Sequence, residues 1–119
     1  MDFNLKICAR HLQQGDISTT LDQLVKDKVI PKPNHIKIDV DGFEHKILQG
    51  AKKTLESKDL KSVPLEINWN IDEHQKIIDH MDTKDFTFDP NQAETAKKKE
   101  GSFTGIGNCI FFRKSQVKN

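Results

Sequence analysis

The segment "HIKIDVDGFEHKILQGAKKTL", residues His35–Leu55, decides the fold of this chain. Its first part alternates apolar and polar residues from Ile36 to Val40, which is typical of a half-buried strand. Two carboxylates and a glycine follow, and apolar residues then recur at helical spacing from Phe43 to Leu55. The segment therefore predicts a strand, an acidic turn and a helix, in that order.

The flanking segments repeat this alternation. "DISTTLDQLVKD" predicts a short helix capped by Ser18, Thr19 or Thr20. "SVPLEINWN" predicts a second strand, and Asn70 with Glu73 resembles a capping box that starts the next helix. Strand and helix thus continue to follow each other along the chain.

The last third of the sequence predicts two more strands. "DFTF" and "GNCIFFRK" are short and rich in apolar residues, and no helix is predicted between them, so we expect them to pair antiparallel at one edge. The intervening "DPNQAETAKKKEGSFTGIG" shows no apolar periodicity and is predicted to be a long loop.

This order of elements predicts an α/β fold. We expect a mostly parallel sheet of about four strands, with an antiparallel last strand and helices on both faces. A length of 119 residues allows one domain, so residues 1–119 are predicted to form a single domain. With 34% hydrophobic and 31% charged residues, the core should be modest.

Composition excludes several classes of function. The net charge is +1, from 19 basic and 18 acidic residues, so no overall field attracts nucleic acid or a membrane surface. No apolar run reaches membrane-spanning length, and the first residues lack the apolar core of a secretion signal, which predicts a cytoplasmic location. Cys8 and Cys109 show neither metal-ligand spacing nor a disulfide framework, so we expect buried thiols in a reducing compartment.

The acidic turn lies where an α/β sheet binds its ligands. Ligands bind outside the carboxyl ends of the strands, which places Asp39, Asp41 and Glu44 at the functional edge. A calcium-binding EF-hand is excluded, because its ligand positions would fall on Lys37 and Leu48. Two structural alternatives remain open: Asp41 caps the following helix, and Glu44 complements the helix dipole.

Three segments resemble one enzyme family. "STTLDQLV", "HIKIDVDGFEHKILQGAKKTL" and "PLEINWN" resemble the FkbM-type S-adenosylmethionine-dependent methyltransferases, in which T-L-D-x-L precedes K-I-D-V-[DE]-G-x-E and L-x-G-A. The resemblance covers most of Ser18 to Asn70, and "NCIFFRK" looks like the last strand of the family. It implies a Rossmann-like class I methyltransferase fold and O-methylation of a hydroxyl on a sugar, glycan or metabolite.

The resemblance also implies roles for the acids. Asp39 and Asp41 would lie beside the methyl donor and the acceptor, with Asp39 in contact with S-adenosylmethionine. Methyl transfer to oxygen needs a base near the acceptor hydroxyl, and Asp39, Asp41 and Glu44 are the candidates. Clustered carboxylates also suit a divalent metal, but we predict no metal site.

The end of the next predicted strand offers candidates for binding the acceptor. Glu66 and Asn68 are placed to orient a substrate, and Trp69 to stack on a sugar ring. Two alternatives remain open: Glu66 and Asn68 pair with neighbouring backbone groups, and Trp69 belongs to the core.

The chain departs from the family pattern before the acidic turn. The glycine-rich turn and the ribose-binding acid that the family places after its first two strands are not visible, so we expect a C-terminal half of the domain that binds S-adenosylmethionine weakly or not at all when alone. Gly105 and Gly107 lead into a strand rather than a helix, so we interpret them as loop flexibility rather than a cofactor turn.

This departure has two consequences for partners and function. The strand at Ile36–Val40 would lack a neighbour on one edge, which predicts that a second copy of the chain or a missing N-terminal half covers it. Two alternatives to an active enzyme stay open: a non-catalytic remnant or assembly subunit, and a small-molecule binding module.

Overall fold

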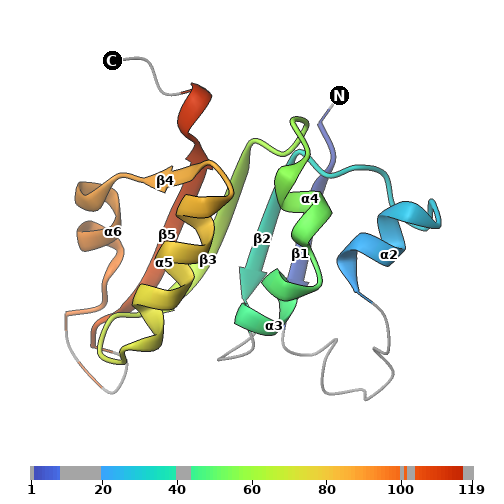
Figure 1. Cartoon of the computed structure of the whole chain (residues 1–119). Helices are drawn as coiled ribbons and strands as arrows, with labels where there is room; N and C mark the ends of the chain where they lie inside the picture. The colour runs from blue at the N-terminus through green and yellow to red at the C-terminus, as the bar shows by residue number, and fades with distance from the viewer. Residues whose placement is uncertain (1, 9–19, 40–43, 100, 102–103, 117–119) are drawn as a thin grey trace. The chain divides into compact units, whose positions relative to one another are not determined.

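The computed structural model describes residues 2–8, 20–39, 44–99, 101 and 104–116. The chain divides into two compact units, an N-terminal unit of residues 1–61 and a C-terminal unit of residues 62–119 (Figure 1). Helices and strands alternate along both units, which confirms the α/β class. The described elements are β1 (Asn4–Cys8), α2 (Leu21–Lys26), β2 (His35–Asp39), α3 (Glu44–Gln49), α4 (Lys52–Glu56), β3 (Ser62–Asn68), α5 (Glu73–Thr83), β4 (Phe86–Phe88), α6 (Pro90–Ala96), β5 (Ile106–Arg113) and the 3₁₀ turn η1 (Lys114–Gln116).

The N-terminal unit contains a strand that the sequence analysis did not predict. β1 pairs in parallel with β2, in a register that runs from Asn4 opposite His35 to Cys8 opposite Asp39. The prediction that β2 lacks a neighbour on one edge is therefore wrong, because residues 4–8 of the same chain occupy that edge. The argument for a partner that covers β2 loses this support.

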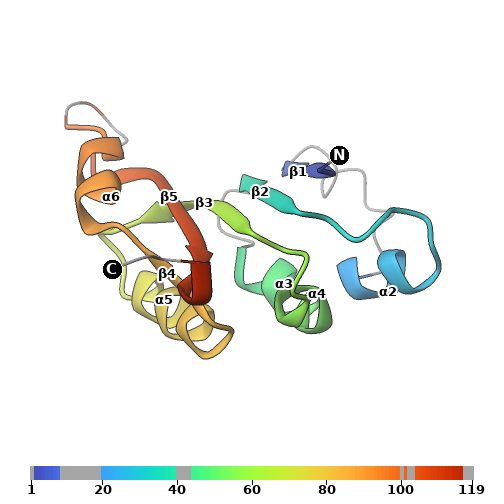
Figure 2. The same cartoon turned by 90° about the horizontal axis from the view of Figure 1, so that it is seen from above.

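The helices of the N-terminal unit lie on one side of the strand pair. Figures 1 and 2 show α2, α3 and α4 on the same side of β1 and β2. Among the described residues of this unit no helix lies on the other side, so the prediction of helices on both faces is not met here. Its buried apolar residues are Leu21, Ile36, Ile38, Leu48, Ala51, Leu55 and Leu60.

The helix predicted from Phe43 to Leu55 is two shorter helices. α3 ends at Gln49 and α4 begins at Lys52, because the first turn of α2 inserts its polar groups at the break. The Asp22 amide donates to the Gly50 carbonyl at 2.9 Å. A Cβ atom on Gly50 would lie 2.8 Å from the Thr20 Cβ, so only glycine allows this approach.

The side chain of Asp22 fixes α2 to α4. Its carboxylate accepts hydrogen bonds from the Lys53 amide at 2.9 Å, the Thr54 amide at 2.8 Å and the Thr54 hydroxyl at 2.7 Å. The two amides are backbone donors of the first turn of α4, which have no partner within the helix. Thr20 caps α2 in the same way by accepting from the Gln23 amide, as predicted.

The C-terminal unit is built on antiparallel strands. β5 lies between β3 and β4 and pairs antiparallel with both, which confirms the predicted antiparallel pairing of the last two strands. Alternate residues of β3 are buried, as expected for a strand with one face against the core. α5 covers these strands and α6 packs against β5 (Figures 1 and 2). The buried apolar residues are Val63, Leu65, Ile67, Met81, Phe86, Ala93, Cys109 and Phe111.

Two local predictions for this unit are wrong. The segment predicted to be a long loop contains α6, which begins with Asp89 accepting a hydrogen bond from the Asn91 amide and with Pro90 at the first helical position. The predicted capping box of α5 is not formed, because its N-cap residue is Asp72 and the Asn70 side chain donates to the Thr104 carbonyl instead.

Candidate functional site

The carboxyl ends of β1 and β2 form the edge at which the acids were predicted. Asp39 is the last residue of β2 and lies in register with Cys8, the last residue of β1. Because the two strands are parallel, both end at the same edge, which is where ligands bind in α/β sheets. The backbone of Asp39 is thus placed as predicted, while its side chain lies outside the described residues.

Glu44 is a buried acid immediately after this edge. It is the first residue of α3 and only 7% exposed. The free amides of a helix N-terminus favour a carboxylate at this position. Glu44 follows Asp39 by five positions, so their Cα atoms lie within about 18 Å of each other. Asp41 falls between them, in residues 40–43, outside the described part.

The end of β3 carries the predicted acceptor-binding residues. Glu66 and Asn68 are half-buried and lie opposite Asn108 and Ile106 of β5. The Asn68 side-chain oxygen accepts a hydrogen bond from the Asn70 amide at 3.0 Å, so this side chain pairs with neighbouring backbone. That contact is the structural alternative expected for Asn68, and it leaves the side-chain amide group as a donor.

Trp69 packs in a cluster with other rings. Its ring centroid lies 5.2 Å from that of His74 and 6.0 Å from that of Phe88, and the Lys97 ammonium nitrogen lies 4.8 Å from the indole centroid. The indole Nε1 is buried and finds no hydrogen-bond acceptor among the described residues. The ring thus contributes to packing, and its N–H remains a donor that a ligand oxygen would satisfy.

Gly105 and Gly107, which were interpreted as loop flexibility, are both closely approached by other groups. Gly105 has a φ of +85°, and a Cβ there would lie 2.6 Å from Oδ1 of Asn70. A Cβ on Gly107 would lie 2.4 Å from the Ala96 carbonyl oxygen. Both positions bring other groups against the bare backbone, and Gly107 lies within β5.

His80 lies partly buried on α5, although it is a polar residue of a helix. It is half-buried on α5, and its Nε2 is buried with no partner among the described residues. Burial lowers the pKa of His80, and the charge of Lys84 lowers it further.

No group of three or more His, Cys, Asp or Glu side chains in the described part is placed to hold a metal ion.

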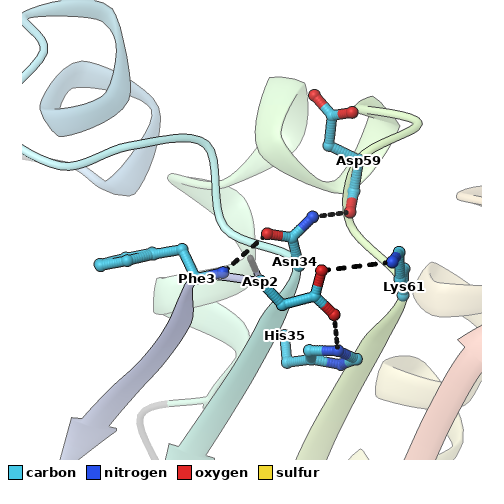
Figure 3. Close-up of polar contacts among 6 residues, drawn as sticks. All are labelled: Asp2, Phe3, Asn34, His35, Asp59 and Lys61. Carbon is cyan, nitrogen blue, oxygen red and sulfur yellow. Dashed lines mark hydrogen bonds and ion pairs between the residues drawn. The ribbon is translucent and has the colours of Figure 1, made fainter.

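The amino ends of β1 and β2 carry a polar cluster that the sequence analysis missed (Figure 3). The Asn34 side chain accepts from the Phe3 amide at 2.8 Å and donates to the Asp59 carbonyl at 3.0 Å. The Asn34 carbonyl accepts from the Lys61 amide at 2.7 Å. Asn34 therefore joins the start of β1 to the segment after α4, and its contacts are structural.

Asp2 adds charged contacts with His35 and Lys61 to this cluster (Figure 3). Its carboxylate lies 3.1 Å from Nε2 of His35 and 3.4 Å from the ammonium nitrogen of Lys61. The hydrogen bond with His35, followed by that with Lys61, lowers the pKa of Asp2. All three side chains are exposed to solvent by a third or more, so these ion pairs contribute little to stability.

Within the described part, no helix is both long and apolar enough for a membrane crossing.

The methyltransferase FkbM domain model matches residues 14–90, which is more than half of the chain. This range includes α2 through β4 and every candidate site residue, and it ends before β5, so the predicted likeness of "NCIFFRK" to the family stays a prediction. No curated protein and no solved structure shows a significant match to the chain.

Proposed function

Since the chain belongs to the methyltransferase FkbM family, we propose that it takes part in methyl transfer from S-adenosylmethionine to a hydroxyl oxygen of a sugar, glycan or metabolite. The observation that supports this most is the position of Asp39, which ends β2 beside the end of the parallel strand β1 and lies within the family match. Such an edge is the usual ligand position in this class of fold.

The acids of this edge suit the methyl donor. S-Adenosylmethionine supplies an electrophilic methyl group on a positively charged sulfonium, and it carries ribose hydroxyls and an ammonium group. Carboxylates accept hydrogen bonds from hydroxyl and ammonium groups, and such charge-assisted bonds are about twice as strong as neutral ones. We assign this binding role to Asp39, at the end of β2.

Transfer to oxygen requires a base for the acceptor proton. The hydroxyl oxygen forms a bond to the methyl carbon while the carbon–sulfur bond breaks, and the proton passes to a group within hydrogen-bond reach. Glu44 supports this role by its burial in the first turn of α3, and Asp41 lies between it and Asp39 in the sequence. We propose Glu44 or Asp41 as the base.

The acceptor is assigned to the end of β3. Trp69 offers a buried indole N–H with no partner among the described residues, and Asn68 keeps a side-chain amide donor. Sugars and other polyols carry many hydroxyl oxygens that accept such hydrogen bonds. We propose that Glu66, Asn68 and Trp69 orient a polyhydroxylated acceptor.

A methyl-transfer assay tests this proposal. Radiolabelled S-adenosylmethionine is incubated with the protein and a panel of monosaccharides, glycans and polyols, and the label transferred to the acceptor is counted. We expect transfer to at least one acceptor and its loss in Asp39→Ala and Glu44→Gln. Asp72→Asn is the matched control, because Asp72 is exposed and makes no side-chain capping bond at the start of α5.

Two results would contradict the enzyme proposal. Equal methyl transfer by Asp39→Ala and by the parent protein would show that Asp39 takes no part in the reaction. Binding of S-adenosylmethionine without transfer to any acceptor would favour the alternative of a binding module with the same fold.

A further inference from the structure

A groove in the N-terminal unit lies apart from the acidic edge. It lies between α2 and α4, which stand side by side in Figures 1 and 2, and it has a volume of about 730 Å³. Neither Asp39 nor Glu44 lines it. Small-molecule sites have volumes of about 300–1,000 Å³, so this groove is large enough for a ligand of that kind.

The walls of the groove are held in place by the chain itself. Asp22 lines the groove and joins α2 to α4 through its three hydrogen bonds with Lys53 and Thr54. The Asp22 amide also bonds to the Gly50 carbonyl. A ligand would therefore meet a preformed site and would not have to order the two helices on binding.

Lysine side chains supply the positive charge of the groove. Lys26, Lys32, Lys53 and Lys58 line it, and within the described residues none of their four ammonium groups has an ion pair or hydrogen bond. The carboxylate of Asp22 is already engaged by its three donors.

Two other carboxylates, those of Glu56 and Asp59, line the same groove. They set a limit on the ligand, because a single negative charge would gain little from a surface on which lysines and acids are mixed. A ligand with several anionic groups can instead contact lysines on α2, on α4 and in the segments after each helix. Multiple charge-assisted bonds then offset the cost of approaching the acids.

From this arrangement we propose that the groove binds a small molecule with two or more phosphate or sulfate groups. The four lysines are its ligands, and Asp22 fixes the distance between the helices that carry two of them. The site goes beyond the proposed methyl transfer and does not depend on it, because it uses none of the acids of the carboxyl edge.

Calorimetry with inorganic pyrophosphate, and separately with a disulfated disaccharide, tests the proposal at low ionic strength. Lys26→Gln and Lys53→Gln should each weaken binding about threefold, and the double variant about tenfold. Lys52→Gln is the matched control, because Lys52 is exposed on the same helix as Lys53 and does not line the groove. Heat with pyrophosphate alone identifies a phosphorylated ligand, and heat with the disaccharide alone identifies a sulfated one.

Thermal unfolding of each variant shows whether the fold is intact, which we expect because the ammonium groups of these lysines have no ion pair or hydrogen bond among the described residues. Unchanged unfolding midpoints together with weaker binding would support the proposal that the groove binds the ligand. Two outcomes would overturn it: no heat with either probe at millimolar concentration, or a loss in Lys52→Gln equal to that in Lys53→Gln.

Discussion

Replacing Asp22 by alanine should lower the free energy of unfolding of the N-terminal unit by more than a typical substitution of a partly exposed residue. The carboxylate accepts from two backbone amides and from the hydroxyl of Thr54, a residue that is only 5% exposed. Loss of a helix cap costs about 0.5–2 kcal/mol, and a buried donor left without a partner costs about 1–3 kcal/mol. Because the two losses share one side chain and solvent reaches part of it, we expect a total of about 2–4 kcal/mol.

Urea unfolding followed by circular dichroism measures this loss, and a melting curve should show a fall in Tm of about 8–15 °C. Asp27→Ala is the matched control, because among the residues that the structure describes the Asp27 carboxylate at the end of α2 bonds only to the exposed side chain of Gln23. We expect less than about 0.5 kcal/mol for it.

A double-mutant cycle with Thr54→Val isolates the hydroxyl contact. Valine keeps the shape of threonine and removes the donor, so Asp22→Ala should cost about 1 kcal/mol less in the Thr54→Val background than in the parent protein. Additive losses, or an Asp22→Ala loss no greater than that of the Asp27 control, would refute the claim that Asp22 joins the two helices.

Further predictions concern other parts of the two units. Asn34→Ala removes the hydrogen bonds that join β1 to the segment after α4, and the free energy of unfolding in urea should fall by about 1–3 kcal/mol. Gly107→Ala places a methyl group 2.4 Å from the Ala96 carbonyl oxygen, so the same measurement should show a loss of about 1–3 kcal/mol. Hydrogen bonds with His35 and Lys61 lower the pKa of Asp2 in the folded state, so the small contribution of this carboxylate to stability is complete above its unfolded-state pKa and is lost as the pH falls through the lower folded-state pKa. The urea stabilities of the parent protein and Asp2→Asn should therefore differ slightly at neutral pH and converge in acid. Burial raises the pKa of the Cys109 thiol to about 12, so peptide mass spectrometry should find it unmodified by iodoacetamide at neutral pH in the folded protein and modified in urea.

Local patterns in the sequence were sufficient for the strands and helices with strong periodicity. β2 and β3 alternate buried and half-buried residues, and the cap at Thr20 is a short-range contact of the kind that a sequence displays. α6 was missed although Asp89 and Pro90 mark its start, because its residues are mostly polar and show no apolar stripe.

Contacts between distant segments account for the remaining differences. β1 is five residues long, with Asn4 and Lys6 exposed, and it is stabilised by pairing with β2 about thirty residues away, which no local pattern displays. The break between α3 and α4 likewise depends on Asp22, which lies outside the segment that it divides.

The sequence predicted the backbone positions of the candidate site residues, but not the side-chain contacts that they make. The position of Asp39 at a strand end and that of Glu44 at a helix start follow from the order of the elements. The ring cluster around Trp69 and the hydrogen bond of Asn68 depend on side-chain packing, which the sequence does not specify locally. The groove between α2 and α4 was missed because its lysines are spread over a long stretch of the chain.

Binding of S-adenosylmethionine to the acidic edge is the most direct test of the proposed function. Saturation-transfer NMR detects weak ligands, and we expect a signal that Asp39→Ala weakens by about tenfold in affinity, because a charge-assisted hydrogen bond is lost. Asp72→Asn should bind as the parent protein does. No signal at millimolar ligand, or equal binding by all three proteins, would contradict the assignment of the methyl donor to the carboxyl end of β2.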